Sequence, residues 1–222
     1  MMQPLWVKDL QPVSSEFLEQ KDTVRLAREL VGHYLVHWIE GKAVGGKIVE
    51  TEAYQAPHDP ACHAHLNRRT KRTEIMFAKG GHAYIYLCYG IHHLFNIVSG
   101  PESYAHAVLI RALEPIWGRD FMDENRKIKS THNLTNGPGK LTQALGIDRT
   151  LNESYLLAQN SPLQLFQPPA PLSADELMVS KRIGIDYAGD AKEWPWRFYE
   201  KQSLYVSKRL FGDKSFLRHE AN

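Results

Sequence analysis

Two carboxylates and a phenol stand at every second position of one short segment of this chain. Within residues 48–54, the groups that could do chemistry are Glu50, Glu52 and Tyr54, and the residues between them are Val49, Thr51 and Ala53. Residues two apart on a β-strand point to the same side. A strand here would carry one small, largely apolar face toward a core. Its other face would hold groups able to do acid–base chemistry or to hold a ring.

The two carboxylates are open to two interpretations. With a rise of ~3.3 Å per residue, Glu50 and Glu52 would lie roughly 6.6 Å apart, a separation compatible with the acid and base of an inverting sugar hydrolase. One carboxylate could instead work alone, with the other in structural support. Strand alternation does not decide between these interpretations, and it does not say which of the two would be the working carboxylate.

A tyrosine-rich stretch supplies further candidates. Residues 83–98 read as two strands hinged near Tyr89-Gly90, with Tyr84 and Tyr86 on one face of the first strand and Tyr89 at the tip. Tyrosine is common in strands, so these rings could simply be core residues. A ring at a turn is hard to bury, however. It could wedge between base pairs and fill the gap left by an extruded nucleotide.

Basic residues and histidines cluster beside these rings. Four cations fall within residues 67–72, and five of the eleven histidines precede or flank the aromatic stretch. The C-terminal part adds further cations, namely Lys201, Lys208, Arg209, Lys214 and Arg218. Such clusters are consistent with a solvated face or with a surface that contacts phosphates and stacks on bases.

The loop at residues 55–72 also raises the question of a metal. It holds four possible zinc ligands and a carboxylate, namely His58, Cys62, His63, His65 and Asp59. Their spacing matches no familiar zinc pattern, and no second cluster of ligands follows. Hydrogen bonding within the loop, or a histidine ring that stacks on a ligand, is the simpler interpretation.

The run Gly137-Pro-Gly-Lys140 resembles parts of two known devices. A phosphate-binding P-loop would need a glycine at position 134 and a serine or threonine at position 141, and leucines stand at both. A helix-hairpin-helix element would need a catalytic aspartate context that is not evident here. A turn at the start of a helix is therefore favoured.

Size and composition point to one ordinary domain. A chain of 222 residues can bury a core, and 43% hydrophobic with 23% charged residues is typical of soluble globular proteins. No run approaches the ~18 apolar residues of a membrane span, the N-terminus lacks a signal-peptide pattern, and two cysteines are too few for a disulfide framework. These features predict a cytoplasmic protein. The net charge of +2 does not by itself point to nucleic acid.

Hydrophobic periodicity places the elements that must position these residues. A helix is predicted over residues 22–36, capped by Asp22 or Thr23. Further helices are predicted over 115–129 and 140–145, and strands over 42–54, 105–111, 182–185 and 196–199 in addition to the two within 83–98. Without an internal repeat or a domain boundary, one mixed α/β domain is the simplest account.

Seven segments, in this order, resemble the alkyladenine (3-methyladenine) DNA glycosylase family. They are residues 48–54, 84–90, 96–97, 109–115, 137–141, 182–185 and 197–199. Each is weak alone, but seven in the family's order, spanning about residues 15–207, are specific. The resemblance implies an α+β fold with one compact domain over residues 1–222. This domain would have a curved, mainly antiparallel sheet, peripheral helices and a protruding β-hairpin that inserts into DNA.

The resemblance also implies roles for individual residues. Glu52 matches the general base that activates the attacking water, and Arg111 and the backbone carbonyl of Ile183 match groups that hold that water. The positions that would bind the flipped base or enter the duplex are Tyr54, His63 and Tyr86, whose rings would sandwich the base, Asn96, which would disfavour the exocyclic amine of guanine, and Tyr89, which would intercalate.

The implied chemistry suits these residues. Alkylation at purine N3 or N7 leaves a cationic base that departs readily, so one carboxylate can stabilise the oxocarbenium-like sugar while it polarises water. No motif segment presents an obvious Schiff-base lysine. We therefore expect a monofunctional hydrolase that leaves an abasic site, without lyase activity. Its substrates would be purines of the 3-methyladenine type, with hypoxanthine and ethenoadenine as further candidates.

The resemblance implies no cofactor, no metal and no membrane. Its partner would be duplex DNA containing alkylated purines, and the enzyme would be a monomer of the bacterial cytoplasm, associated with the nucleoid. Two alternatives stay open. One is a metal-dependent hydrolase that uses Glu52 and the cluster at His58–His65. The other is a non-enzymatic nucleic-acid-binding module that uses the tyrosines only for stacking.

Overall fold

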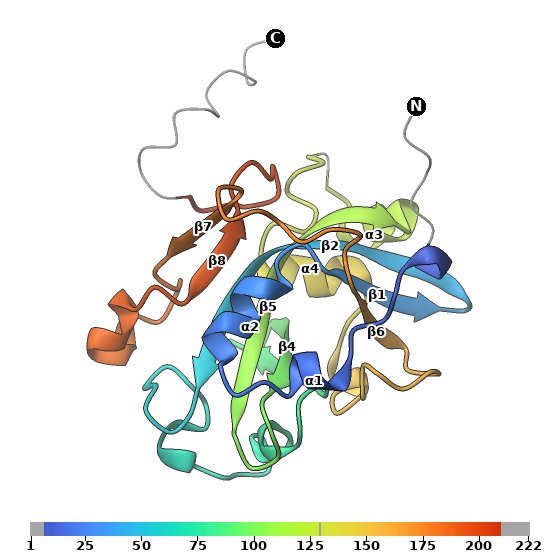
Figure 1. The fold of residues 1–222 in the computed structure, drawn as a ribbon. Coiled ribbons are helices and arrows are strands. Elements are labelled where there is room, and N and C mark those ends of the chain that lie inside the picture. Colours follow the sequence, from blue (N-terminus) through green and yellow to red (C-terminus); the bar gives the residue numbers. More distant parts are fainter. Residues whose placement is uncertain (1–6, 129, 210–222) are drawn as a thin grey trace.

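One curved antiparallel sheet organises the chain (Figure 1). In this computed structural model, residues 7–128 and 130–209 are described, and Lys214 and Arg218 of the predicted basic region lie outside them. The described strands are β1 (Tyr34–Ile39), β2 (Lys42–Gln55), β3 (Ala83–Cys88), β4 (His92–Ser99), β5 (His106–Trp117), β6 (Leu163–Phe166), β7 (Leu177–Ser180) and β8 (Arg197–Glu200).

The strand order places the longest strands at the centre. The main path is β3-β4-β5-β2-β1-β6, and β8 pairs both with β2 and with β7. Every described pairing is antiparallel. The α-helices are few and short: α1 (Ser15–Leu18), α2 (Thr23–Leu30), α3 (Arg119–Arg126) and α4 (Pro138–Leu145). The described residues therefore form one compact α+β domain, as the sequence predicts.

Helices α2 and α4 cover one face of the sheet and form the main core with it. From α2, Leu26, Ala27 and Leu30 are fully buried in this core. Helix α4 contributes Leu141 and Leu145 to the same cluster. The hydroxyl of Thr51 on β2 donates to the backbone carbonyl of Ala27, which fixes α2 against the strand. Helix α2 therefore does not cover the opposite face of β2, which carries Glu52.

Several boundaries differ from the predicted ones. The helix expected over 22–36 has Asp22 as its N-cap, as predicted, but ends at Leu30, because Gly32 takes a φ of +99° and the chain turns into β1. Helix α3 begins only at Arg119, since β5 continues through Trp117. The predicted strand over 182–185 is wrong, because these residues form an irregular loop between β7 and a 3-10 helix at Asp186–Glu193.

The sequence predictions hold for the other elements around the site. Strand β2 covers the predicted 42–54, and β3 and β4 form the predicted antiparallel pair with Tyr89-Gly90 in the connecting turn. The run at 137–140 starts a helix, with Gly137 as N-cap and Pro138 in the first turn, as favoured from the sequence.

A bulge interrupts β2 in its most informative segment. Ile48 pairs with Leu113 and Glu50 with Ala112 of β5, which leaves Val49 as an extra residue. Ile48 lies in the main core, whereas Val49 packs with Ala112 in a separate cluster. At a bulge, two consecutive side chains can lie on the same face of the sheet.

The bulge corrects one prediction from strand alternation. Val49 was expected to share a face with Thr51 and Ala53, but Ala53 lies in the main core while Val49 packs against Tyr199 on the other side of the sheet. Alternation resumes after the bulge, so Glu52 still lies opposite Ala53.

A second bulge follows one residue pair further along, on the neighbouring strand β5. Thr51 pairs with Ile110, so Arg111 is the extra residue of β5. Bulges re-aim a side chain and increase the local twist. The guanidinium of Arg111 reaches both Glu50 and Glu52 on the neighbouring strand. The two bulges therefore bring together the charged groups of the site.

Among the described residues, no helix combines the length and the apolar character that a bilayer span requires.

Candidate active site

A pocket of about 520 Å³ opens on the face of the sheet away from α2. It is lined by strands β2 to β5, by the loop after β2, by the N-terminal turn of α4 and by the loop at 183–187. Among the lining residues are seven predicted from the sequence, namely Tyr54, His63, Tyr86, Tyr89, Asn96, Arg111 and Ile183. Residues separated by more than a hundred positions thus meet in one cavity.

A row of paired residues crosses the sheet, forms the floor of this pocket and ends beside it at Glu52. Tyr84 on β3 pairs with Asn96 on β4, Asn96 with Leu109 on β5, and Leu109 with Glu52 on β2. Directly opposed residues of antiparallel strands carry their side chains on the same face. Continuous pairing therefore fixes the position of the Glu52 carboxylate relative to Asn96.

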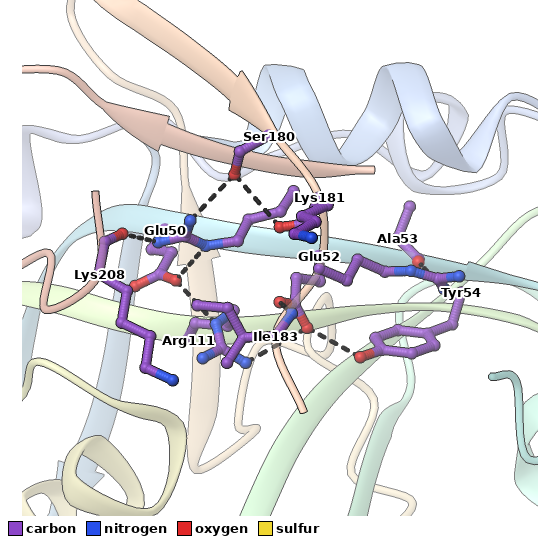
Figure 2. A network of polar contacts seen from close by, with 11 residues as sticks. Glu50, Glu52, Ala53, Tyr54, Arg111, Ser180, Lys181, Ile183 and Lys208 are labelled. Atoms are coloured by element: carbon purple, nitrogen blue, oxygen red, sulfur yellow. Dashed lines mark hydrogen bonds and ion pairs between the residues drawn. The ribbon is translucent and has the colours of Figure 1, made fainter. Parts of the chain in front are cut away.

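Glu52 is fully buried and held by three donors (Figure 2). Its Oε1 accepts the backbone N–H of Ile183 at 2.8 Å. Its Oε2 accepts the hydroxyl of Tyr54 at 2.8 Å and the guanidinium of Arg111 at 3.3 Å. A buried carboxylate with this many donors is held in one orientation. Glu52 does not itself line the pocket, but its three donors, Tyr54, Arg111 and Ile183, all do.

Glu50 has a different environment. Its Oε1 accepts from Nε of Arg111 at 2.8 Å and from Nε of Arg197 at 2.6 Å (Figure 2). Arg197 in turn donates to Oγ of Ser180 and to the backbone carbonyl of Lys208. Like Glu52, Glu50 does not itself line the pocket, but only one of its two donors, Arg111, does, because Arg197 is not among the lining residues. Its carboxylate ties β2 to β5 and β8, which fits a structural role.

The charges near Glu52 shift the pKa values of its neighbours. Burial by itself would lower the pKa of Arg111, but the carboxylates of Glu52 and Glu50 outweigh this and raise it above its usual value. Burial, and then the negative charge of Glu52, raise the pKa of Tyr54 well above its usual value. Arg111 therefore remains a cation, and the hydroxyl of Tyr54 remains a hydrogen-bond donor to Glu52.

Three further aromatic rings that line the pocket, those of His63, Tyr84 and Tyr86, lie close together. The rings of His63 and Tyr86 meet edge to face with centroids 4.6 Å apart, and those of Tyr84 and Tyr86 lie 5.4 Å apart. A nitrogen of His63 is 2.7 Å from the hydroxyl of Tyr84. Burial, and then the nearby guanidinium of Arg72, lower the pKa of His63 to about 4, so this ring is uncharged at neutral pH.

Asn96 and Tyr89 both line the pocket but differ in exposure. The side-chain amide of Asn96 is buried on the floor and donates to the backbone carbonyl of Tyr84 at 3.1 Å. Tyr89, at the tip of the β3–β4 turn, is 89% exposed and has a φ of +51°. The core interpretation of Tyr89 is therefore wrong, whereas Tyr84, which is buried, fits it.

The possible metal ligands of the 55–72 loop do not gather. Within the described residues, no group of three or more His, Cys, Asp or Glu side chains is placed to hold an ion. His58 is exposed, and Cys62 is buried, where desolvation raises its pKa to about 12. Of this set, only His63 reaches the pocket.

Three residues in or behind the pocket wall were assigned no part in the pocket from the sequence, which offered Asp59 only as a possible metal ligand. Arg182 makes a buried ion pair with Asp59 and lies against the ring of Tyr54. Arg182 belongs to the segment at 182–185 and Asp59 to the loop at 55–72. A pairing of side chains 123 positions apart leaves no signal in a single sequence. The third is Lys140, which lines the pocket although no lysine was expected there, and which donates to Asn136 at 2.7 Å.

Comparison with known proteins gives concordant matches over nearly the same span. The family model described as "Methylpurine-DNA glycosylase (MPG)" matches residues 16–204. Two relatives named "Putative 3-methyladenine DNA glycosylase" illustrate the similarity. One, from Chlamydia pneumoniae, is 47% identical over 84% of this chain and 93% of its own length. The other, from Desulfitobacterium hafniense, is 44% identical over 84% of this chain and 94% of its own.

Proposed function

Because this chain belongs to the methylpurine-DNA glycosylase family, we propose that it flips alkylated purines out of duplex DNA and hydrolyses their N-glycosidic bond. The water that attacks the sugar would be activated by Glu52, and an abasic site would remain. The observation that carries this proposal is the buried carboxylate of Glu52, whose three donors all line a pocket walled by aromatic rings.

The environment of Glu52 suits the departure of a cationic base. As the base leaves, positive charge grows on the deoxyribose, and a fixed carboxylate in a site shielded from water stabilises that charge. Ionised Arg111 on the other side of Glu52 keeps the carboxylate oriented. The carbonyl of Ile183 belongs to the same residue whose N–H holds Glu52, so a water held by that carbonyl and Arg111 would lie within reach of the carboxylate.

The ring walls would bind the flipped base. Tyr54 lines one part of the pocket, and His63 and Tyr86 line another. A cationic purine between uncharged aromatic faces is attracted to their π-electrons. The low pKa of His63 supports this role, because a charged imidazolium would repel such a base.

Two further residues would control entry and selection. Tyr89 is exposed at the tip of the β3–β4 turn, where it could enter the duplex in place of the flipped nucleotide. Asn96 lies on the floor in the same row as Glu52 and would meet the edge of the base, where an exocyclic amine distinguishes guanine from the lesions. On this basis we include hypoxanthine and ethenoadenine with 3-methyladenine among the proposed substrates.

We also propose a monofunctional, monomeric enzyme that works on DNA in the bacterial cytoplasm, at the nucleoid. Lys140 is the lysine of the pocket that could form a Schiff base in a lyase reaction, because burial lowers its pKa. Its ammonium group, however, is held by Asn136 at the start of α4 and has no described contact with Glu52. Borohydride should therefore trap no covalent complex between the enzyme and an abasic duplex.

The decisive experiment offers the protein duplexes that each contain one defined lesion, in the presence of a chelator, and identifies the released bases. Wild type should release 3-methyladenine, and Glu52→Gln should slow release by about a hundredfold or more while it keeps lesion binding. Glu193→Gln, which removes an exposed carboxylate paired with Lys181, is the matched control.

Three outcomes would contradict parts of the proposal. Unchanged release by Glu52→Gln would show that another group is the base. Binding of lesions without any release would favour the binding module. Loss of release in chelator, with recovery on adding a divalent metal, would favour the metal-dependent hydrolase.

A further inference from the structure

Asp59 and Arg182 form an ion pair with both side chains fully buried, 0% exposed each. The contact is bidentate, with Nη1 donating to Oδ2 at 2.6 Å and Nη2 to Oδ1 at 2.8 Å. The guanidinium also donates to the backbone carbonyls of Ala53 and Ala191. A buried pair costs desolvation energy, so its presence beside a binding pocket calls for a reason.

The guanidinium of Arg182 lies between two rings. Its carbon is 4.8 Å from the ring centre of Tyr54 and 5.1 Å from that of Trp196. Tyr54 lines the pocket, and Arg182 does not. Arg182 therefore contacts Tyr54 from behind, on the side away from a base that stacks in the pocket. Its bond to the carbonyl of Ala53 fixes the residue directly before that ring.

This arrangement would place a full positive charge about 8 Å behind a stacked base, counting one ring-stacking distance on each side of Tyr54. A unit charge at that distance, at an effective dielectric constant of about 20, disfavours a cationic ligand by roughly ten- to thirtyfold. A neutral ligand is not affected in this way. The charge of Arg182 is thus harmful to one class of substrate unless something cancels it.

The other charges near Tyr54 balance without Asp59. Glu50 and Glu52 carry two negative charges, and Arg111 and Arg197 carry two positive ones within the same set of contacts. Arg72 lies 4.7 Å from the ring centre of Tyr86, but it is exposed, so solvent screens its charge. Asp59 is the carboxylate in direct contact with Arg182.

We propose that Asp59 is a specificity-determining residue, whose carboxylate cancels the charge of Arg182 behind Tyr54 and so allows the pocket to accept purines that carry a positive charge. This inference rests on the proposed function. It goes beyond it in assigning the preference between cationic and neutral lesions to a residue that does not touch the base. Arg182 is then a positioning residue, which packs against Tyr54 and binds the backbone carbonyls of Ala53 on β2 and of Ala191 in the 3-10 helix.

The test compares binding to a duplex with 3-methyladenine, which is cationic while its glycosidic bond is intact and lacks the 2-amino group of guanine, and to one with ethenoadenine, which is neutral. A 2′-fluoro group on each lesion nucleotide slows hydrolysis, and fluorescence anisotropy gives the dissociation constants. Asp59→Asn should weaken binding to the cationic lesion by roughly ten- to thirtyfold more than binding to the neutral one. If wild type binds only the cationic lesion specifically, the undamaged duplex is the neutral reference.

Two further variants separate charge from support. The double variant Asp59→Asn/Arg182→Met removes both charges and should recover most of the lost preference, although it also loses the ion pair. Arg182→Met alone leaves a carboxylate behind the ring and should shift the preference toward the cationic lesion. It serves as the test if Asp59→Asn does not fold. Glu74→Gln, which breaks an exposed ion pair with Arg69, should change neither constant.

Equal losses for both lesions in Asp59→Asn, or a double variant no better than Asp59→Asn, would overturn the inference and leave Asp59 as a structural residue only. A wild type that distinguishes neither lesion from undamaged DNA would contradict the proposed function instead. The two failures are therefore distinguishable.

Discussion

The hydroxyl of Tyr54 donates a hydrogen bond of 2.8 Å to Oε2 of Glu52, two residues earlier on the same strand. A residue expected to serve only as a wall for the base thus also holds the carboxylate that would activate water. The same Oε2 has only one other described donor, the guanidinium of Arg111 at 3.3 Å. Ring and hydroxyl can be separated by substitution, and this gives the first prediction.

Tyr54→Phe keeps the ring but removes the hydrogen bond to Glu52. We expect base release to slow by about tenfold, the size of one hydrogen bond to a charged group, while lesion binding changes less than twofold. Single-turnover rates and dissociation constants measured on the same duplex test this. Tyr54→Ala is the companion variant and should weaken binding as well. Weakened binding in Tyr54→Phe would mean that the hydroxyl contacts the DNA directly.

Glu50 and Glu52 should differ in what their loss affects. Glu50→Gln leaves Arg111 and Arg197 buried without their shared carboxylate, and we expect a loss of about 3–5 kcal/mol in unfolding free energy. Denaturant unfolding and the melting temperature measure it. Glu52→Gln should lose activity and much less stability. A stable Glu50→Gln enzyme without activity would return Glu50 to the chemistry.

Tyr89 should show a conflict between stability and function. Its φ of +51° suits glycine, so Tyr89→Gly should raise the unfolding free energy by up to about 1 kcal/mol while it weakens lesion binding. Tyr89→Ala keeps a side chain in this strained conformation and should leave stability within about 0.5 kcal/mol. A large loss of stability in either variant would show that the ring packs against the fold.

Buried histidines should make the fold sensitive to mild acid. Burial lowers the pKa of His33 to about 4, and burial with the charge of Arg72 does the same for His63. The unfolded chain binds these protons near pH 6.5, and the folded chain does not. Stability from this source is therefore complete above pH 6.5 and falls as the pH drops toward 4.

We expect each of these histidines to cost the fold at most about 2 kcal/mol at pH 5 relative to pH 7.5. Urea unfolding at the two pH values measures the difference. His33→Phe should reduce it, because a phenyl ring can keep the stacking against Phe17 without titrating. An unchanged difference in His33→Phe would show that other groups dominate the acid sensitivity.

The sequence predicted which residues form the site, but not the backbone irregularities that orient their side chains. Alternation placed Glu52 and Tyr54 on one face, and the tyrosine pattern placed Tyr89 in a turn, because both depend on local periodicity. Local periodicity does not predict a bulge, so Val49 was assigned to the wrong face and the aim of Arg111 toward Glu50 and Glu52 was not foreseen.

Long-range pairing accounts for the remaining differences. The helix predicted to reach Val36 is shorter because β1 gains hydrogen bonds from both β2 and β6, and such tertiary pairing overrides a helical pattern. The segment at 182–185 looked like a strand, but its backbone and side chains serve Glu52 and Asp59 instead of a ladder. Partners this distant in sequence cannot be read from one chain.

The uncharged rings of the pocket have a consequence for turnover. When the glycosidic bond breaks, the departing purine keeps the bonding electrons and loses its positive charge. If these rings hold the base as proposed, the attraction that Tyr54, Tyr86 and neutral His63 offer to a cation would vanish in the same step. We therefore expect the excised base to inhibit weakly and to leave quickly. The slow step of each cycle would be the departure of the abasic duplex.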